Sequence, residues 1–253
     1  MLTLTQAQLD AWVAAFVWPF LRVLAFIGTA PLLHDRAVPA RVKVGLAAAV
    51  AAAIAPSLPA APVSLSAPGA LLLIAQQVLI GVALGWSLRI VFAAVELAGD
   101  LVGLQMGLAF AGFIDPASGH PSPMVGSFLA LLATLIFLAI DGHLMMIAAL
   151  GESFRAVPVG ADGAPLTDPA RLVATGATLF RIGLELALPA LVTMLLVNLA
   201  LGVLARAAPQ LNVFAVGFPA TLLVGFAALA AALAAFGPAV TAALEGAVAA
   251  MLP

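Results

Sequence analysis

The chain has 253 residues, of which 65% are hydrophobic and 8% are charged, and its mean hydropathy is +1.24. Because soluble domains carry about 25% charged residues, this composition indicates an integral membrane protein, or a subunit buried almost entirely among similar partners, without a separate soluble domain. The net charge of −2 argues against nucleic acid as a partner, and the absence of cysteine excludes disulfides and thiolate metal sites.

Hydrophobic windows of about 20 residues, long enough to cross a bilayer core as helices, recur along the chain. They lie at residues 11–33, 70–98, 124–140, 172–204 and 213–236, with a shorter sixth at 44–56. Residues 238–252 are interpreted as a continuation of the last helix beyond Gly237-Pro238. Segments 57–69 and 156–170 are rich in helix-breaking residues and predict loops. The predicted fold class is therefore an all-α, polytopic membrane protein with about six long hydrophobic helices.

The chain ends and the basic residues bear on topology. The N-terminal sequence MLTLTQAQLDAW has no basic segment before its apolar run, so it does not resemble a cleaved signal peptide. Lys and Arg cluster at Arg36, Arg41 and Lys43, and Arg206 lies in a later connection; such residues are enriched in cytoplasmic loops. Both connections are cytoplasmic only if residues 99–123 dip into the membrane and return.

The central stretch GDLVGLQMGLAFAGFIDPASGHPSP combines a glycine pattern with helix breakers. Gly99, Gly103 and Gly107 are spaced by four residues, which places them on one helix face where another backbone can approach closely. The following Asp115-Pro116 pair and the later prolines exclude a helix. Two interpretations remain open: a tightly packed helix followed by a surface turn, or an apolar loop that occupies a lumen.

Six ionisable residues lie within or at the ends of hydrophobic windows, where each needs a partner. They are Arg22, Arg89, Glu96, Asp100, Arg181 and Glu185. Arg181 and Glu185 are four residues apart and can pair on one helix face. Glu96 and Asp100 have the same spacing but like charge, and Arg89 is the nearest cation in sequence. A proton relay and pairing with neighbouring subunits both remain open for these residues, and we expect buried charges that pair between subunits.

No pattern of an enzyme or of a metal site is found. His34, His120 and His143 have no ligand spacing among themselves. The serines lack the setting of an intramembrane serine protease, the aspartates lack that of an intramembrane aspartyl protease, and nothing resembles a phosphate-binding or dinucleotide-binding loop. The residues alone therefore indicate a channel-like or transporter-like membrane component without cofactor or catalysis.

Four segments in order along the chain resemble the FliR family, the membrane export-gate subunits of the flagellar type III secretion apparatus. These are RVLAFIGTAPLL (22–33), ELAGDLVGLQMGLAFAGFIDP (96–116), FLALLATLIFLAIDGHLMMIAALGESFRAVPVG (128–160) and RAAPQLNVFAVGFP (206–219). The homologous SctT-type subunit of virulence injectisomes is a close alternative. A proton-coupled small-solute transporter is the alternative from a different class.

The resemblance implies a subunit that joins FliP and FliQ homologues around a pore for unfolded flagellar polypeptides, in the bacterial inner membrane within the flagellar basal body. Residues 1–170 are then similar in fold to FliP, and residues 171–253 form a FliQ-like hairpin. The hairpin turn faces an FlhB homologue, and Gly217 and Pro219 interrupt the helix after it. The residues expected in the turn and its contact are Arg206, Pro209, Gln210, Asn212 and Phe214.

The resemblance also implies that the central loop, near residues 106–123, is a plug that fills the closed pore. Its expected residues are Met106, Phe110, Phe113, Ile114, Asp115 and Pro116. Flexible apolar side chains exclude water and ions, yet can move aside for a polypeptide. FliR-type subunits perform no catalysis, so the energy for export would come from other components.

Overall fold

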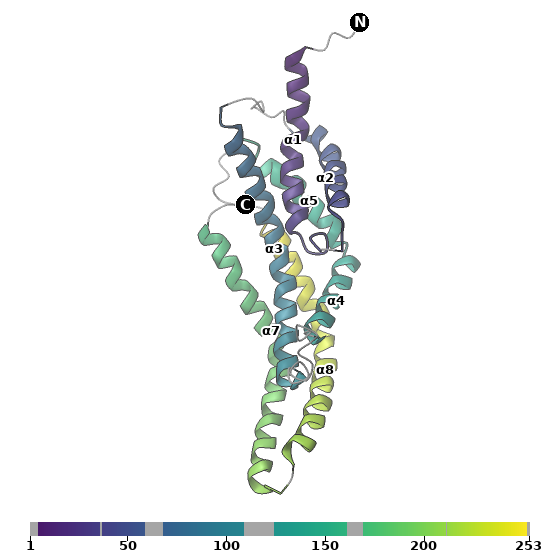
Figure 1. The fold of residues 1–253 in the computed structure, drawn as a ribbon, viewed down its shortest axis with the longest axis vertical. Coiled ribbons are helices and arrows are strands. Elements are labelled where there is room, and N and C mark those ends of the chain that lie inside the picture. The colour runs from purple at the N-terminus through teal and green to yellow at the C-terminus, as the bar shows by residue number, and fades with distance from the viewer. Residues whose placement is uncertain are drawn as a thin grey trace. The chain divides into compact units, whose positions relative to one another are not determined.

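The computed structural model describes residues 5–35, 37–58, 68–108, 124–160, 169–210 and 212–251, and these residues form helices and turns without any strand (Figure 1). The helices are α1 (Gln6–Thr29), α2 (Ala40–Ile54), the short 3₁₀ helix η1 (Ala55–Ser57), α3 (Ala70–Gln105), α4 (Met124–Ala139), α5 (Gly142–Ala156), α7 (Pro169–Ala207) and α8 (Val213–Ala249). The predicted all-α class is confirmed.

Within the described ranges, five helical segments are long and apolar enough to cross a membrane. They are Asp10–Thr29, Ala40–Ser57, Ala70–Gln105, Val173–Ala207 and Ala215–Ala249, and α4 and α5 count as a sixth if they are taken together. The prediction of about six hydrophobic helices in a polytopic protein is therefore confirmed. Asp141, between α4 and α5, has a left-handed backbone with φ of 55°. The expected window 124–140 therefore corresponds to α4 alone, and α5 follows it as a second helix.

Three helices are much longer than the hydrocarbon core of a bilayer requires. Helix α3 has 36 residues, α7 has 39 and α8 has 37, which at 1.5 Å per residue makes each roughly 55 Å long. The expected interruption at Gly217 and Pro219 is wrong, because both lie inside α8, as does Pro238. Where water is absent, a helix is the main way to satisfy backbone groups, so it continues despite the one hydrogen bond that each proline removes.

The chain forms two compact units, each built from several segments. The first comprises Met1–Ile90, Asp141–Gly176 and Leu244–Pro253, and the second comprises Val91–Ile140 and Ala177–Ala243. Neither unit ends at residue 170, where the sequence analysis places a boundary, since α3, α7 and α8 each contribute to both units. The likeness of residues 1–170 to FliP and of residues 171–253 to FliQ stays a prediction.

The first unit contains a buried arginine, Arg22 on α1, whose side chain is 0% exposed. Its Nε donates to Gln77 Oε1 at 2.8 Å, its Nη1 donates to the carbonyl oxygen of Ser153 at 2.8 Å, and its Nη2 donates to the carbonyl oxygen of Val157 at 2.8 Å. The guanidinium also lies over the Phe154 ring, 4.0 Å from its centroid. Arg22 thereby joins α1 to α3 and to the end of α5.

The C-terminal end of α5 explains why a cation can be buried there without a carboxylate. The last carbonyl groups of a helix have no partner within it, and they carry the negative end of the helix dipole. Val157 is the residue that follows α5, and Ser153 lies in its last turn. Arg22 satisfies both carbonyl groups at once, so the helix end stabilises the charge while the charge caps the helix.

Helices α1 and α3 approach closely beside Arg22 because α3 has glycines at the contact. A Cβ atom on Gly81 would lie 2.8 Å from the Cβ of Ala25, and one on Gly85 would lie 3.0 Å from the backbone nitrogen of Ala30. Real Cβ atoms do not approach other atoms so closely, so Gly81 and Gly85 set the separation of the two helices.

Replacing Arg22 with methionine is predicted to destabilise the protein strongly, because Gln77 Oε1 and two carbonyl groups lose their buried donor. Each unsatisfied buried group costs about 1–3 kcal/mol. The matched control is Arg155→Met, which removes an exposed arginine paired with Glu152. Thermal unfolding of the purified protein in detergent, followed by tryptophan fluorescence, measures both variants. Equal midpoints for the two would show that the Arg22 contacts add little.

Candidate functional site

The second unit holds the point where α3 ends and the central loop begins. The backbone nitrogen of Met106 donates to the carbonyl of Val102 at 3.0 Å, and that of Gly107 donates to the carbonyl of Leu104 at 3.1 Å. Gly107 then takes a left-handed backbone with φ of +80°, a conformation that glycine adopts without strain and that commonly ends helices. The prediction that Gly107 shares a helix face with Gly99 and Gly103 is wrong, because it lies after the helix and terminates it.

Met106 lies directly before this turn and packs against α8, and its side chain is 0% exposed. Its carbonyl oxygen accepts a hydrogen bond from Thr221 Oγ1 at 3.3 Å. Its thioether lies against Gly225, where a Cβ atom would be 2.9 Å from the sulfur. The preceding residue, Gln105, accepts a hydrogen bond through Oε1 from Asn198 Nδ2 on α7 at 3.1 Å. The end of α3 is thus tied to both α7 and α8.

These contacts place Met106 at the packed root of the loop rather than in a free plug. The other residues expected in the plug, Phe110, Phe113, Ile114, Asp115 and Pro116, lie outside the described residues. We name the set Gln105, Met106, Gly107, Asn198, Thr221 and Gly225 the loop root. Asn198, Thr221 and Gly225 were not predicted. Their only signal in the sequence is that they are isolated polar residues and a glycine inside apolar windows.

Gly99 lies where α3 meets the first turns of α4. A Cβ atom on Gly99 would be 2.5 Å from the Cα of Gly126, and one on Gly126 would be 2.9 Å from the carbonyl oxygen of Glu96. At Gly103 a Cβ atom would be 3.4 Å from a methyl group of Val125, which is tight but near ordinary contact. The backbones of α3 and α4 therefore meet at Gly99 and Gly126, and Gly126 is the partner that the sequence analysis did not identify.

Asp100 faces the same contact and is half-buried. Its Oδ1 atom lies so close to Gly126 that a Cβ atom there would overlap it, and Oδ1 accepts no hydrogen bond from the residues that the structure describes. Gly126 is in the first turn of α4, and the N-terminal end of a helix carries the positive end of its dipole. That helix end, rather than a basic side chain, lies against the Asp100 carboxylate.

The other expected intramembrane charges are not buried within this chain. Arg89, Glu96, Arg181 and Glu185 are exposed. In the described part of the chain the only ion pair joins Arg155 to Glu152, so Arg181 and Glu185 do not pair with each other. The expectation that these charges pair with neighbouring subunits stays a prediction, since a single chain leaves them exposed. Among the described residues, the charged side chain that is fully buried is that of Arg22.

The connection between α1 and α2 carries the basic residues used to infer topology. Lys43 Nζ donates to the carbonyl oxygens of His34 at 2.8 Å and of Asp35 at 3.0 Å. Slight desolvation, followed by the positive charges of Arg89 and Lys43, lowers the pKa of His34. Across the described ranges, no three His, Asp or Glu side chains lie close enough together to hold a metal ion, and Arg36 lies outside those ranges.

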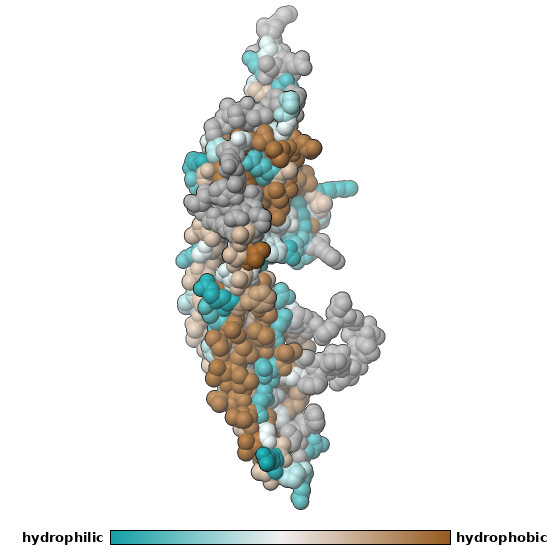
Figure 2. All heavy atoms as spheres, turned by 90° about the vertical axis from the view of Figure 1, so that its left-hand side faces the viewer, coloured by the Kyte–Doolittle hydropathy of each residue, from teal (hydrophilic) through white to brown (hydrophobic). Residues whose placement is uncertain are grey.

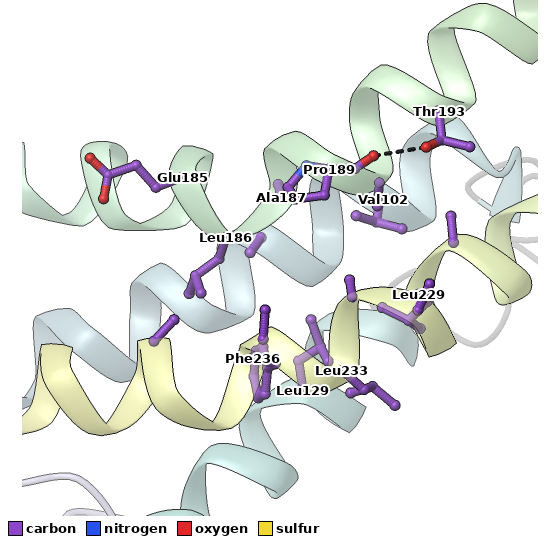
Figure 3. A pocket seen from close by; sticks show the side chains of 17 residues that line it. Val102, Leu129, Glu185, Leu186, Ala187, Pro189, Thr193, Leu229, Leu233 and Phe236 are labelled. Atoms are coloured by element: carbon purple, nitrogen blue, oxygen red, sulfur yellow. Dashed lines mark hydrogen bonds between the residues drawn. The ribbon is translucent and has the colours of Figure 1, made fainter.

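An apolar cleft of about 340 Å³ opens between α7 and α8, with α3 and α4 contributing to its wall (Figure 3). The α7 wall includes Glu185, Pro189 and Thr193. Alanines form much of the rest: Ala98, Ala187, Ala190, Ala228, Ala231, Ala232, Ala235 and Ala239. Alanine side chains are too short to fill the space between two helices, so the cleft follows from the composition of the wall. The alanine-rich stretch of α8 contains no motif that would predict a cleft from the sequence.

The turn between α7 and α8 is short and exposed. Pro209 and Gln210 follow α7, and Asn212 precedes α8. The backbone nitrogen of Ala215 lies 3.3 Å from Asn212 Oδ1 and 3.0 Å from its carbonyl oxygen. Asn212 therefore caps the N-terminus of α8, a role for which Asn is among the preferred residues. Arg206 is exposed in the last turn of α7, and nothing is described of the Phe214 side chain.

The surface of α7 is strongly apolar where it leaves the core of its unit. Leu196 is 63% exposed and Leu199 is 67% exposed, and Leu188, Leu195 and Val203 are also exposed. Figure 2 shows hydrophobic residues gathered over the lower part of the face that α7 occupies in Figure 1. Exposed apolar surface of this extent indicates contact with lipid or with other apolar protein.

Comparison with known proteins gives one consistent result. Residues 13–247 match the family described as bacterial export proteins, family 1. The flagellar biosynthetic protein FliR of Escherichia coli K12 is 48% identical over 240 residues, which cover 94% of this chain and 91% of that protein. FliR of Pectobacterium carotovorum is 47% identical over 90% of this chain and 88% of its own length, and FliR of Bacillus subtilis is 34% identical over 84% and 83%. The resemblance inferred from four segments is confirmed over nearly the whole chain, which belongs to the FliR family of bacterial export proteins.

Proposed function

We propose that this chain is a core membrane subunit of the flagellar type III protein export gate and forms part of the channel for unfolded flagellar proteins. The observation that carries the proposal is the 48% identity to a flagellar biosynthetic protein FliR over 94% of the chain. Similarity to several flagellar relatives favours the flagellar gate over a virulence injectisome. Catalysis has no part in this role.

Assembly with other gate subunits is supported by the lengths and surfaces of the helices. Helices α3, α7 and α8 are each roughly 55 Å long, whereas the hydrocarbon core of a bilayer is about 30 Å thick. Their apolar surface therefore extends beyond what lipid tails can cover, and exposed residues such as Leu196 and Leu199 need protein neighbours. We assign these neighbours to FliP and FliQ homologues in the bacterial inner membrane.

The central loop is proposed to seal the closed pore. Its apolar residues Phe110, Phe113 and Ile114 are followed by prolines and glycines that cannot continue a helix. Support comes from the described residues on either side of it. Met106 accepts a hydrogen bond from α8, and Val125 and Gly126 pack against α3. Both ends of the loop are therefore held by helix packing, so its central residues can change without loosening the helices.

The exposed turn between α7 and α8 is proposed to contact an FlhB homologue. Support comes from the concentration of polar groups in a chain that has few of them, with Arg206, Gln210 and Asn212 exposed together. Phe214 is the apolar residue proposed for the same contact.

We predict that the protein co-purifies with FliP and FliQ homologues as one complex when the three are co-expressed, because the long apolar helices need protein neighbours. Mass spectrometry of the purified complex identifies the subunits. A solute carrier, by contrast, is stable alone in detergent and binds a small ligand. Recovery of a monodisperse monomer from the co-expression would therefore refute the assembly.

In the turn, Arg206→Glu and Asn212→Ala are each predicted to impair flagellar protein export while the gate remains assembled. Motility and secretion are measured in a strain that lacks the native copy, with co-purification as the assembly readout. Loss of a helix cap alone costs about 1 kcal/mol. Asn212→Ser retains the cap but not the amide, and Arg155→Glu reverses an exposed charge elsewhere as the control. Normal export with Asn212→Ser would assign Asn212 to capping only, and normal motility with both primary variants would refute the contact.

Changing Phe110 and Phe113 together to alanine is predicted to raise the leak of ions through the gate more than it weakens assembly. Burial of each ring is worth about 1.5–3 kcal/mol, and that stabilisation of the seal is lost. Dye leakage from vesicles that contain the purified complex measures the seal. The control is Phe180→Ala with Phe226→Ala, which removes two exposed rings from α7 and α8. Loss of the complex with unchanged permeability would make the loop an ordinary packing element.

A further inference from the structure

The end of α3 is attached to α7 and α8 at the loop root by two neutral hydrogen bonds. Asn198 Nδ2 on α7 donates to Gln105 Oε1 at 3.1 Å, and Thr221 Oγ1 on α8 donates to the carbonyl oxygen of Met106 at 3.3 Å. A hydrogen bond of this kind between membrane helices shifts an equilibrium by only about threefold on average. The attachment is therefore weak compared with the buried guanidinium of Arg22, which donates to three different residues.

The Thr221 hydroxyl has a second acceptor within its own helix. It lies 3.3 Å from the carbonyl oxygen of Met106 and 3.0 Å from that of Phe218. Because a hydroxyl carries a single hydrogen, these two acceptors compete for it. Thr221 is only 8% exposed, and an unpaired donor in such a place is costly. Since Phe218 stays in place as an acceptor, α8 can lose its contact with Met106 without leaving the hydroxyl unpaired.

The remaining contacts of Met106 can also be broken without strain. Its side chain packs against Gly225, where a Cβ atom would lie 2.9 Å from the sulfur, and methionine is flexible about three rotatable bonds. Gly107 follows with φ of +80°, and glycine adopts other backbone conformations readily. The backbone nitrogen of Met106 donates to the carbonyl of Val102 within α3 itself. On the α8 side, release therefore leaves only the Met106 carbonyl oxygen without its partner.

Both interhelical bonds lie close to the exposed turn of the α7–α8 hairpin. Asn198 precedes Arg206, and Thr221 follows Asn212, by roughly 12–14 Å of helix. Asn198 and Gln105 are half-buried, so neither side-chain amide is enclosed in the core. A displacement of the turn therefore acts directly on the residues that hold the end of α3.

We propose that the loop root is a releasable attachment through which the α7–α8 hairpin holds the end of α3. When it opens, Thr221 gives up the Met106 carbonyl oxygen and keeps its hydrogen bond to Phe218. The regulatory consequence rests on the proposed function of the central loop, because that loop begins where α3 ends. The attachment itself lies within one chain and needs no other subunit.

Hydrogen exchange of the full chain in detergent, measured by mass spectrometry, tests the attachment. The reporter is the peptide that contains the backbone amides of Met106 and Gly107, which are hydrogen-bonded at the end of α3. Thr221→Val keeps the shape of the side chain but removes the hydroxyl. The reporter amides should then exchange about threefold faster, the factor expected for one interhelical hydrogen bond. Gly225→Ala places a methyl group against the Met106 sulfur and should accelerate exchange further.

Two control variants make the same chemical changes away from the loop root. Thr134→Val removes a hydroxyl that donates to the Ala130 carbonyl of its own helix at 2.9 Å. Gly237→Ala adds a Cβ atom with nothing within 4 Å of it. Neither control should change exchange at the reporter amides. Unchanged exchange in both root variants would overturn the proposal. So would equal acceleration along the whole of α7 and α8, which would indicate a permanent structural support.

Dye leakage from vesicles that contain the assembled gate separates this proposal from the proposed seal. Thr221→Val and Gly225→Ala should each raise the leak, as should the alanine variant of Phe110 and Phe113. A leak that rises in the phenylalanine variant but in neither root variant would overturn the regulatory role of the loop root. If none of these variants leaks, the proposed seal is refuted, while faster exchange at the reporter amides still supports the releasable attachment.

Discussion

The absence of water around most of this chain requires that each backbone N–H and C=O group be satisfied within the protein, and helices satisfy most of them internally. That requirement accounts for helices that continue through Pro19, Pro189, Pro219 and Pro238. The absence of water also removes the hydrophobic effect as the driving force for packing helices together, because lipid tails are as apolar as leucine side chains. Specific contacts between helices must then come from close backbone approach and from a few polar groups.

Charged side chains lie where backbone groups need partners. Helix ends are the main places where these groups remain unpaired. Arg22 lies at the C-terminal end of α5 and donates to its last carbonyl groups. Asp100 lies against the first turn of α4, near the positive end of that helix. In each unit, a charged side chain in an apolar segment thus lies at the helix end whose dipole has the opposite sign. Pairing by sequence spacing, which suggested Arg181 with Glu185, did not anticipate either arrangement.

Hydropathy alone predicted the fold class and the positions of the hydrophobic helices other than α5, because the membrane imposes a minimum apolar length on any spanning segment. The positions where helices begin and end were predicted less well. Proline and glycine at 217–219 were interpreted as breakers from their behaviour in water, yet the helix continues through them. Gly107 was assigned to a packing face by its spacing, whereas its positive φ ends α3. Local sequence does not distinguish these outcomes, since tertiary contacts and solvent decide between them.

Small residues have two opposite effects in this chain, and only the partner helix decides which one applies. At Gly99 and Gly126, or at Gly225 beneath Met106, the missing side chain lets two elements come into direct contact. Along the α7 and α8 walls, alanines face each other across a gap that none of the described residues fills. The residues of the site could be listed from the sequence only where a motif identified them. The loop root and the cleft depend on pairs such as Met106 with Gly225 that are more than 100 residues apart, so no local pattern could connect them.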